Sequence, residues 1–400
     1  MSDSHRFVSP NEVRMGSGSA DQIGDLMMAR GTSALVVATS GVFDRYGDRI
    51  VGHLQEAGLE TTVYDEVDPD PTVANVDAAH ERYREADCDC IVTVGGGSPI
   101  DTGKATGVLA ANGGEIREYA VDRAGYEGVP EPIPPMCAVN TTAGTGSEAT
   151  RSIVVTDEST ATKFLVVSTE AVPAVAVEDP TLTTTLPPSH TAFTGIDALT
   201  HAIEAYVSVH AWSMSDTLAR AAIERVARWL PVAWANGDDL EAREEMLIGQ
   251  FQAGQAFTNA SVALVHGMAR PFGAQLHVPH GLANGILLPY VMAFSTVGRP
   301  GRYADIARLL NAADEDTPDR DAAQAGVDAV ADLCEQIQLH GYLDEFATIP
   351  DRETYASFVP EMAADAVASG SPDNNPRKPS TDEIETLYLE VYDDVLADVA

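Results

Sequence analysis

An acidic residue and a histidine lie four residues apart in the segment 194–206, TGIDALTHAIEAY. The pattern of this segment predicts a helix, and the two residues are Asp197 and His201. Residues four apart on a helix share one face and point the same way. A carboxylate and an imidazole so placed can bind a metal ion, although such a pair by itself is more often an ordinary hydrogen bond.

Three further histidines fall close together in the segment 264–289, LVHGMARPFGAQLHVPHGLANGILLP: His266, His277 and His280. The segment is otherwise apolar, and a buried neutral histidine needs a partner for each ring nitrogen, so clustering without a ligand is costly. One carboxylate and three imidazoles suit a divalent first-row metal, Fe(II) or Zn(II), and leave a position open for substrate. Spacing does not decide whether His277 or His280 binds the metal.

Two loops rich in glycine and hydroxyl groups each follow a strand-like run. Segment 90–105, CIVTVGGGSPIDTGKA, passes from a strand through three glycines into a helix, with Ser98 expected as N-cap and Pro99 as first helical residue. Segment 139–150, VNTTAGTGSEAT, follows another strand. Either loop alone could be a plain turn. Glycines and free N–H groups at a helix start suit a pyrophosphate, and both loops would lie at the ligand-binding carboxyl edge of a parallel sheet.

The elements that position these residues divide the chain near residue 185. Before it, apolar runs alternate with helical spacing, which predicts βαβ units and a parallel sheet covered by helices. After it, the pattern is helical throughout, and a loop, SGSPDNNPRKPS, precedes a last helix at 381–397. In this first part, strands are expected at 34–38, 61–64, 91–94 and 136–139. Helices are expected at 73–86 and 100–111.

Charge is the strongest compositional feature: 61 acidic residues against 24 basic ones give a net charge of -37. Such a surface would repel nucleic acid and anionic membranes. The acids are spread along the whole chain, which favours a solvated coat suited to a very salty cytoplasm over a partner-binding tail. No secretory signal or membrane span is expected, and the four scattered cysteines are expected to be buried thiols.

The motifs together resemble the iron-containing, or group III, alcohol dehydrogenases, the family of lactaldehyde reductase and the bacterial butanol dehydrogenases. The blocks GGGSPIDTGKA, NTTAGTGSEAT, GIDALTHAIEAYVS and LVHGMARPFGAQLHVPHGLANGILLP occur in the family's order and at its distances. The resemblance implies an α/β dinucleotide-binding domain with a parallel sheet at 1–185 and an all-α metal-binding domain at 186–400. It implies iron, with zinc as the alternative, and four metal ligands: Asp197, His201, His266 and His280.

The same resemblance implies that NAD or NADP is the cofactor. Gly97 and Ser98 would contact its pyrophosphate, and the threonines of the second loop, with Lys163, would flank the nicotinamide and its ribose. The positions assigned to the cofactor in these segments are Gly96, Gly97, Ser98, Asp101, Thr141, Thr142, Thr145 and Lys163.

Two departures from the family pattern bear on the choice of cofactor, and they pull in opposite directions. NAD-preferring members carry an Asp after the first strand, where this chain has Thr39 followed by Ser40. Without that carboxylate a 2′-phosphate is not repelled, and both hydroxyls can hydrogen-bond to it, which favours NADP. Asp70 stands where relatives usually have Asn beside the cofactor, and its charge disfavours an added phosphate.

A third departure lies beside the expected metal. Arg270 occupies a position one turn after His266 where many relatives carry a further His. Arginine cannot act as a base near neutral pH, so Arg270 either binds a carboxylate or phosphate on the substrate or packs against the acidic surface. His277 is the alternative for proton relay. Phe257 matches a substrate-pocket position, although a core aromatic is equally consistent with it.

The reaction implied is hydride transfer between an alcohol and NAD(P), reversible to the aldehyde or ketone. The alternatives are a maleylacetate-reductase-like enzyme, which would not need the metal, and a hydroxyacid–oxoacid transhydrogenase. A silent cofactor-binding protein is disfavoured by the complete ligand set. Relatives suggest a homo-oligomer, and the only other expected partner is the small-molecule alcohol or aldehyde substrate.

Overall fold

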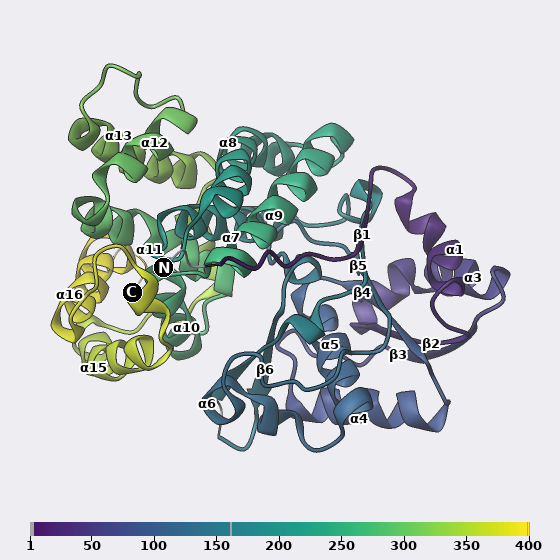
Figure 1. The fold of residues 1–400 in the computed structure, drawn as a ribbon. Helices are drawn as coiled ribbons and strands as arrows, with labels where there is room; N and C mark the ends of the chain where they lie inside the picture. The colour runs from purple at the N-terminus through teal and green to yellow at the C-terminus, as the bar shows by residue number, and fades with distance from the viewer. Residues whose placement is uncertain (1–3, 161, 398, 400) are drawn as a thin grey trace. The chain divides into compact units, whose positions relative to one another are not determined.

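The computed structural model describes residues 4–160, 162–397 and 399, which form two compact units (Figure 1). The first unit is Met1–Thr185 and the second is Leu186–Ala400. The first is built on a parallel β-sheet, and the described residues of the second are helical wherever they are regular. The expected fold class, a parallel α/β unit followed by an all-α unit, is confirmed.

The sheet of the first unit has six strands, and all five neighbouring pairs are parallel. The four strands expected from sequence are β5, β4, β2 and β3, which form the centre and one side of the sheet. Each begins and ends within one residue of the expected position. The two four-residue strands on the other side were not anticipated, because runs that short carry little periodicity. In sheet order the strands are β1 (Glu12–Met15), β8 (Val175–Glu178), β5 (Met136–Asn140), β4 (Cys90–Gly95), β2 (Ser33–Ala38) and β3 (Glu60–Tyr64).

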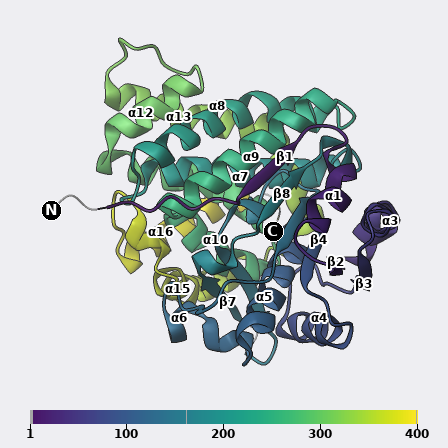
Figure 2. The same cartoon turned by 45° about the vertical axis from the view of Figure 1, so that its right-hand side comes forward.

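Both faces of this sheet are covered by helices, as Figure 2 shows. Side chains alternate along β2: Val36 packs into the cluster that contains α1 and α3, whereas Val37 packs into the one on the opposite face. Burial on both faces explains why the central strands are almost continuously apolar. The helices of this unit are α1 (Ile23–Met28), α2 (Ser40–Val42), α3 (Asp48–Glu56), α4 (Val73–Glu85), α5 (Gly97–Asn112) and α6 (Val121–Ala124).

A separate antiparallel hairpin, β6 (Ser152–Asp157) with β7 (Thr162–Val167), packs beside α5 and was also missed. The expected N-cap of α5 was wrong. The helix begins at Gly97, its N-cap is Gly96, and the Ser98 hydroxyl donates to the carbonyl of Pro69 instead. The chain turns at Gly95, whose φ of +146° suits glycine, so the helix starts earlier than side-chain capping rules suggest.

The second unit packs its helices around α7 and α11. The expected last helix is confirmed over most of its length, since α16 is followed by a π-helical turn at Tyr392–Leu396. The α-helices among its described residues are α7 (Pro188–Val207), α8 (Ser213–Ala235), α9 (Leu240–Ala260), α10 (Leu264–Leu276), α11 (His280–Ser295), α12 (Pro300–Leu309), α13 (Asp319–Gln336), α14 (Leu343–Phe346), α15 (Arg352–Ala368) and α16 (Thr381–Val391).

One stretch, His280–Gly298, is long and apolar enough to cross a membrane by length and composition alone. It consists of α11 and the turn that follows. More than half of it is buried, and side chains such as Leu282, Ile286 and Leu287 are wholly enclosed by neighbouring helices of the same unit. It is therefore the core helix of the second unit.

Candidate metal centre

Helix α7 presents two carboxylates and an imidazole to the interior of the second unit. The helix begins at Pro188, a favourable first position because proline needs no N–H partner there. Asp197, His201 and Glu204 follow at spacings of four and three residues, so they share one face. All three are buried, with at most 6% of any one exposed. Polar groups buried to this extent must satisfy one another or a ligand.

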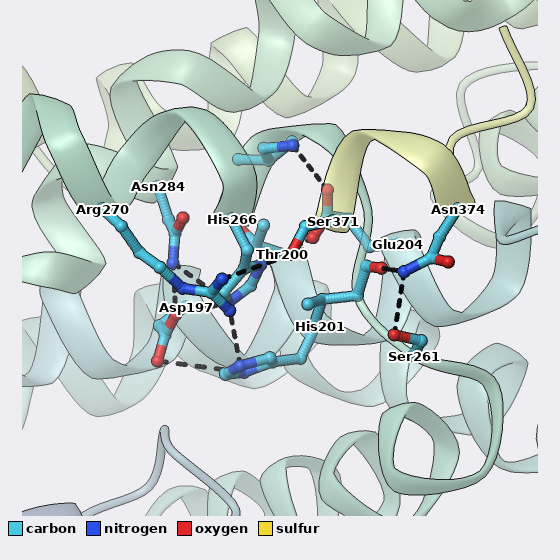
Figure 3. Close-up of polar contacts among 12 residues, drawn as sticks. Asp197, Thr200, His201, Glu204, Ser261, His266, Arg270, Asn284, Ser371 and Asn374 are labelled. Carbon is cyan, nitrogen blue, oxygen red and sulfur yellow. Dashed lines mark hydrogen bonds and ion pairs between the residues drawn. The ribbon is translucent and has the colours of Figure 1, made fainter. Parts of the chain in front are cut away.

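Helix α10 brings His266 against that face (Figure 3). His266 Nε2 lies 2.9 Å from His201 Nε2 and 3.6 Å from Asp197 Oδ1, and His201 Nδ1 lies 3.8 Å from Asp197 Oδ2. Over the described residues, Asp197, His201 and His266 form the one group of acidic, histidine or cysteine side chains with three ligand atoms within 4.8 Å of one another. The structure thus gathers three of the four expected ligands in a buried cluster.

The geometry and chemistry of this group fit a divalent metal. Ligands about 2.1 Å from a tetrahedral metal lie about 3.4 Å from one another. The separations of 2.9 and 3.6 Å between His266 Nε2 and its two neighbours bracket that value. The donors are oxygen and imidazole nitrogen, which suit Fe(II) and Zn(II) alike.

The fourth expected ligand, His280, lies at the rim of the group. It is the first residue of α11, its Nε2 is 3.9 Å from Asp197 Oδ1, and its side chain is 44% exposed. Its ring approaches that of His266 edge-on, with centroids 5.3 Å apart. His277 is exposed as well, and it ends α10 in a left-handed conformation, φ 55°. Among the described contacts, none joins His277 to the cluster.

Glu204 sets the orientation of His266, and the sequence reasoning missed it. Its Oε2 accepts from His266 Nδ1 at 2.6 Å, and its Oε1 accepts from the backbone N–H of Val265 at 2.6 Å. The proton of a neutral His266 therefore sits on Nδ1, and the Nε2 lone pair faces the cluster. The sequence signal that could have identified Glu204 is its position seven residues after Asp197, two helical turns along the same face.

The charges of the cluster favour an ionised acid beside imidazoles. Burial alone would raise the pKa of the Asp197 carboxyl, but His201, His266 and His280 outweigh it and hold that pKa well below its ordinary value. Burial lowers the pKa of His266, and the carboxylates of Glu204 and Asp197 more than reverse this, so the net pKa is raised. A carboxylate that stays ionised in a buried site attracts cations.

Two further side chains contact the cluster. Asn284, on α11 one turn after His280, places Nδ2 2.6 Å from Asp197 Oδ1. Its position four residues after a candidate ligand was the signal that sequence reasoning passed over. Phe257, on α9, stacks on the ring of His201 with centroids 4.3 Å apart and an interplanar angle of 17°. The aromatic expected as a pocket or core residue therefore lies directly against a candidate ligand.

Arg270 lies one turn after His266 on α10, as expected, and is half-buried. Its Nη1 donates to the hydroxyl of Ser371 at 3.2 Å (Figure 3). Ser371 begins the turn Ser371–Asn374, and Asn374 donates to Ser261 Oγ and to the carbonyl of Val262. This turn thus braces both ends of the segment that carries His266.

In the first unit the two glycine-rich loops lie side by side at the carboxyl edge of the sheet. Strands β4 and β5 are neighbours in register, with Gly95 opposite Asn140. A Cβ on Gly96 would meet Thr142, and one on Gly97 would meet the methyl of Thr145. Thr141 is buried and donates from its backbone N–H to Gly95 O at 3.1 Å. The expected juxtaposition of the loops is confirmed, and only glycine permits so close an approach.

Asp101, also expected at the cofactor, faces the interior of the first unit. Its Oδ1 accepts from Ser147 Oγ at 2.5 Å, and its Oδ2 accepts from the backbone N–H of Val154 at 2.9 Å. Lys104, wholly buried, donates to the carbonyls of Ser147 and Ser152. In the structure, Asp101 and Lys104 hold the second loop and the hairpin against α5.

The remaining cofactor positions lie near the ends of β2 and β3 and on the hairpin. Thr39 is the N-cap residue of α2, and the exposed Ser40 donates from Oγ to the carbonyl of Asp65. Asp70 Oδ1 and Lys163 Nζ form an exposed ion pair at 2.6 Å. The charges of Asp70 and Lys163, two positions expected beside the cofactor, therefore offset each other.

Comparisons with known proteins agree with this architecture. The profile of "Iron-containing alcohol dehydrogenase" matches residues 10–180, and that of "Fe-containing alcohol dehydrogenase family, C-terminal" matches residues 191–392. The 1,3-propanediol dehydrogenase of Citrobacter freundii is 38% identical over 390 residues, 96% of this chain and 98% of the relative. The NADPH-dependent butanol dehydrogenase of Clostridium saccharobutylicum (97% and 98% covered) and the lactaldehyde reductase of Escherichia coli strain K12 (96% and 98% covered) are each 34% identical.

Solved structures give the same result. A 1,3-propanediol oxidoreductase superposes with a TM-score of 0.91 at 37% identity, covering 97% of this chain and 100% of that one. An archaeal halo-thermophilic alcohol dehydrogenase from a Red Sea brine pool superposes with a TM-score of 0.87 at 28% identity, covering 98% and 99%. The match extends over both units and includes the segments that carry the acid–histidine cluster. This chain therefore belongs to the iron-containing alcohol dehydrogenase family, whose members are NAD(P)-dependent enzymes.

Proposed function

We propose that this enzyme is an iron(II)-dependent alcohol dehydrogenase whose metal is held by Asp197, His201, His266 and His280. As a member of its family it interconverts alcohols and aldehydes with NAD(P). The metal proposal rests on one observation, the buried group of Asp197, His201 and His266 with ligand atoms within 4.8 Å of one another. His280 completes the set from the start of α11.

The side chains of the site have distinct roles in this proposal. Asp197 supplies the negative charge that offsets a cation, and Glu204 keeps the Nε2 lone pair of His266 directed inward. When bound, a divalent cation acts as a Lewis acid that polarises the substrate oxygen. Phe257 covers one face of His201 and gives the site an apolar wall that limits the access of water.

For the cofactor we propose that the glycine-rich loops of the first unit bind the pyrophosphate and that NADP is accepted. A Cβ on Gly96 or Gly97 would meet Thr142 or Thr145, so the loop presents bare backbone at these two positions. The absence of a carboxylate at Thr39 removes the repulsion that selects NAD. The objection raised by Asp70 is weakened because Lys163 pairs with it.

For the substrate we propose a short primary alcohol or diol. The support is the 38% identity with a protein named 1,3-propanediol dehydrogenase. Arg270 keeps a carboxylate-bearing substrate as the alternative, because its guanidinium lies one turn from His266 and is only half-buried. Parallel assays of primary alcohols, diols and hydroxyacids separate these two classes.

We also propose that the enzyme works in a cytoplasm of high salt. A second proposal is that it forms a homo-oligomer there. The support is a net charge of -37, and the superposition with a halo-thermophilic alcohol dehydrogenase from a brine pool is consistent with it. Light scattering at several salt concentrations measures the oligomeric state directly. A monomer at every salt concentration would refute this part of the proposal.

The test of the metal proposal starts from protein stripped with a chelator in high salt. Fe(II) or Zn(II) is then added back, and alcohol oxidation is measured with NAD and with NADP. Fe(II) is expected to restore activity to the level of the untreated enzyme. Full activity in protein shown to be metal-free would overturn the proposal.

A further inference from the structure

Lys104, on α5, is a wholly buried cation, and its described hydrogen bonds all lead to one segment of the chain. That segment, 147–152, joins the end of the second glycine-rich loop to the start of β6. The Lys104 Nζ lies 2.5 Å from Ser147 O, 3.0 Å from Ser147 Oγ, 3.3 Å from Thr150 Oγ1 and 3.0 Å from Ser152 O. An ammonium group has three N–H donors, so these four acceptors engage it completely.

The charge of Lys104 is balanced by buried acids. Asp101, one turn earlier on α5, places Oδ1 3.9 Å from the ammonium, and Glu148 on the turn Ser147–Ala149 is wholly buried as well. Burial lowers the pKa of Lys104 to about 8, although Asp101 and Glu148 act in the opposite direction. Replacing a buried ion pair by well-packed apolar side chains is often neutral or stabilising, so stability alone does not account for a lysine here.

A short chain of contacts connects Lys104 to the edge where the two loops meet. Lys104 binds the carbonyl and the hydroxyl of Ser147, and the backbone N–H of Ser147 donates to Thr145 Oγ1 at 3.3 Å. Thr145 in turn stands over Gly97, the first residue of α5, since a Cβ on Gly97 would lie 3.2 Å from the methyl of Thr145. Both ends of this chain belong to α5, because Lys104 follows Gly97 by two helical turns.

We propose that Lys104 is a positioning residue for the cofactor, and that its charged form holds the turn Ser147–Ala149 so that Thr145 stays beside Gly97. This inference rests on the proposed cofactor site. Lys104 acts through Ser147, because its side chain is wholly buried. A neutral amine has one N–H fewer and forms weaker hydrogen bonds to carbonyl oxygens, so loss of the proton should loosen the second loop.

The test uses the full-length enzyme in high salt, with K104M and T106V as variants. Methionine keeps the length of the lysine side chain and removes its charge and its donors. Thr106 is a buried residue of the same helix whose hydroxyl has no hydrogen-bond partner among the described residues, so T106V is the matched control. Dissociation constants for NADH and NADPH come from the change in cofactor fluorescence on binding, measured below and above pH 8. Steady-state assays give kcat and the KM for each cofactor.

Below pH 8, K104M is expected to bind both cofactors about tenfold more weakly, as when about a tenth of the molecules hold the loop in place. Its kcat at saturating cofactor should change little, because Lys104 does not contact the reacting atoms. Wild type and T106V should lose affinity as the pH rises through about 8, where Lys104 loses its proton. K104M should not show this loss.

Three outcomes contradict parts of this scheme. Equal dissociation constants for K104M and the wild type below pH 8 would overturn the role of Lys104 and leave the proposed cofactor site intact. If the wild type binds neither cofactor, the proposed cofactor site itself fails. If K104M does not fold, the wild type decides, because an affinity that stays constant as the pH rises through about 8 overturns the inference.

Discussion

Glu204 Oε2 lies 2.6 Å from His266 Nδ1, and this buried contact decides which nitrogen of His266 faces Asp197 and His201. The second oxygen of Glu204 is bound to the backbone N–H of Val265, so the carboxylate is itself held in place. A metal ligand supported in this way loses little freedom when the ion binds, because its ring is oriented beforehand.

Removing that support should weaken metal binding without removing a ligand. E204A is expected to bind Fe(II) about ten- to a hundredfold more weakly, because the ring of His266 can then turn and protonate at Nε2. The measurement is the dissociation constant from chelator competition. E224Q, which neutralises an exposed acid on α8, is the control. Equal affinities of E204A and the wild type would show that Glu204 does not orient the ligand.

The two histidines near the start of α11 should differ in their effect on metal content. H280A is expected to lose most of its bound metal, because the ring nearest to Asp197 on that helix is removed. H277A is expected to keep a full complement, because no described contact joins His277 to the cluster. Metal analysis after dialysis in high salt measures both. Loss of metal from H277A would reverse the assignment of the fourth ligand.

Low salt should unfold the protein, because its acidic residues outnumber the basic ones by more than two to one. The repulsion between these charges decays over about 3 Å at 1 M salt but over about 10 Å at 0.1 M. The four buried cysteines report this change, since burial raises the pKa values of Cys90 and Cys334 to about 12. A thiol reagent should modify none of them in high salt and all four in low salt. Protected thiols in low salt would count against a halophilic protein.

Neutralising Asp70 should strengthen cofactor binding. D70N leaves the charge of Lys163 available to an anionic ligand, because the ion pair at 2.6 Å is lost. The KM for NADP is expected to fall severalfold, and that for NAD to fall less, since the added phosphate carries more charge. The exposed Asp332 on α13 supplies the control D332N, which removes the same charge in the other unit. Identical KM values in D70N and the wild type would place Asp70 away from the cofactor.

The packing of α5 on the sheet can be tested with a pair of glycines. A methyl group on Gly103 would overlap the methyl of Thr93 on β4, so G103A should destabilise the protein by about 1–3 kcal/mol. Gly52, on α3, has open space where a Cβ would be added, so G52A should stabilise it by up to about 1 kcal/mol. Urea unfolding in high salt measures both. A neutral G103A would mean that α5 can move off the sheet.

Some of these features follow from the sequence because they depend on local spacing. Asp197 and His201 share a helix face whatever the rest of the chain does. The strands at 34–38 and 91–94 are apolar runs between turn residues, and their burial on both faces reinforces that pattern. Net charge is a property of composition alone. Local spacing failed at Ser98, which was expected to cap α5. The preceding glycines let the helix begin one residue earlier than Ser98, and the Ser98 hydroxyl donates to the carbonyl of Pro69 instead.

Other features exist only in the folded chain, because they join residues far apart in sequence. Spacing within α7 predicts a pair, but the packing of α10 against it brings His266 to within 2.9 Å of His201. The partner of His266 is Glu204, 62 residues away, and the partner of Asp197 is Asn284, 87 residues away. Spacing alone also left His277 and His280 as competing candidates. The left-handed residue His277 ends α10 without a described contact to the cluster, and α11 then starts with His280, whose Nε2 lies 3.9 Å from Asp197 Oδ1.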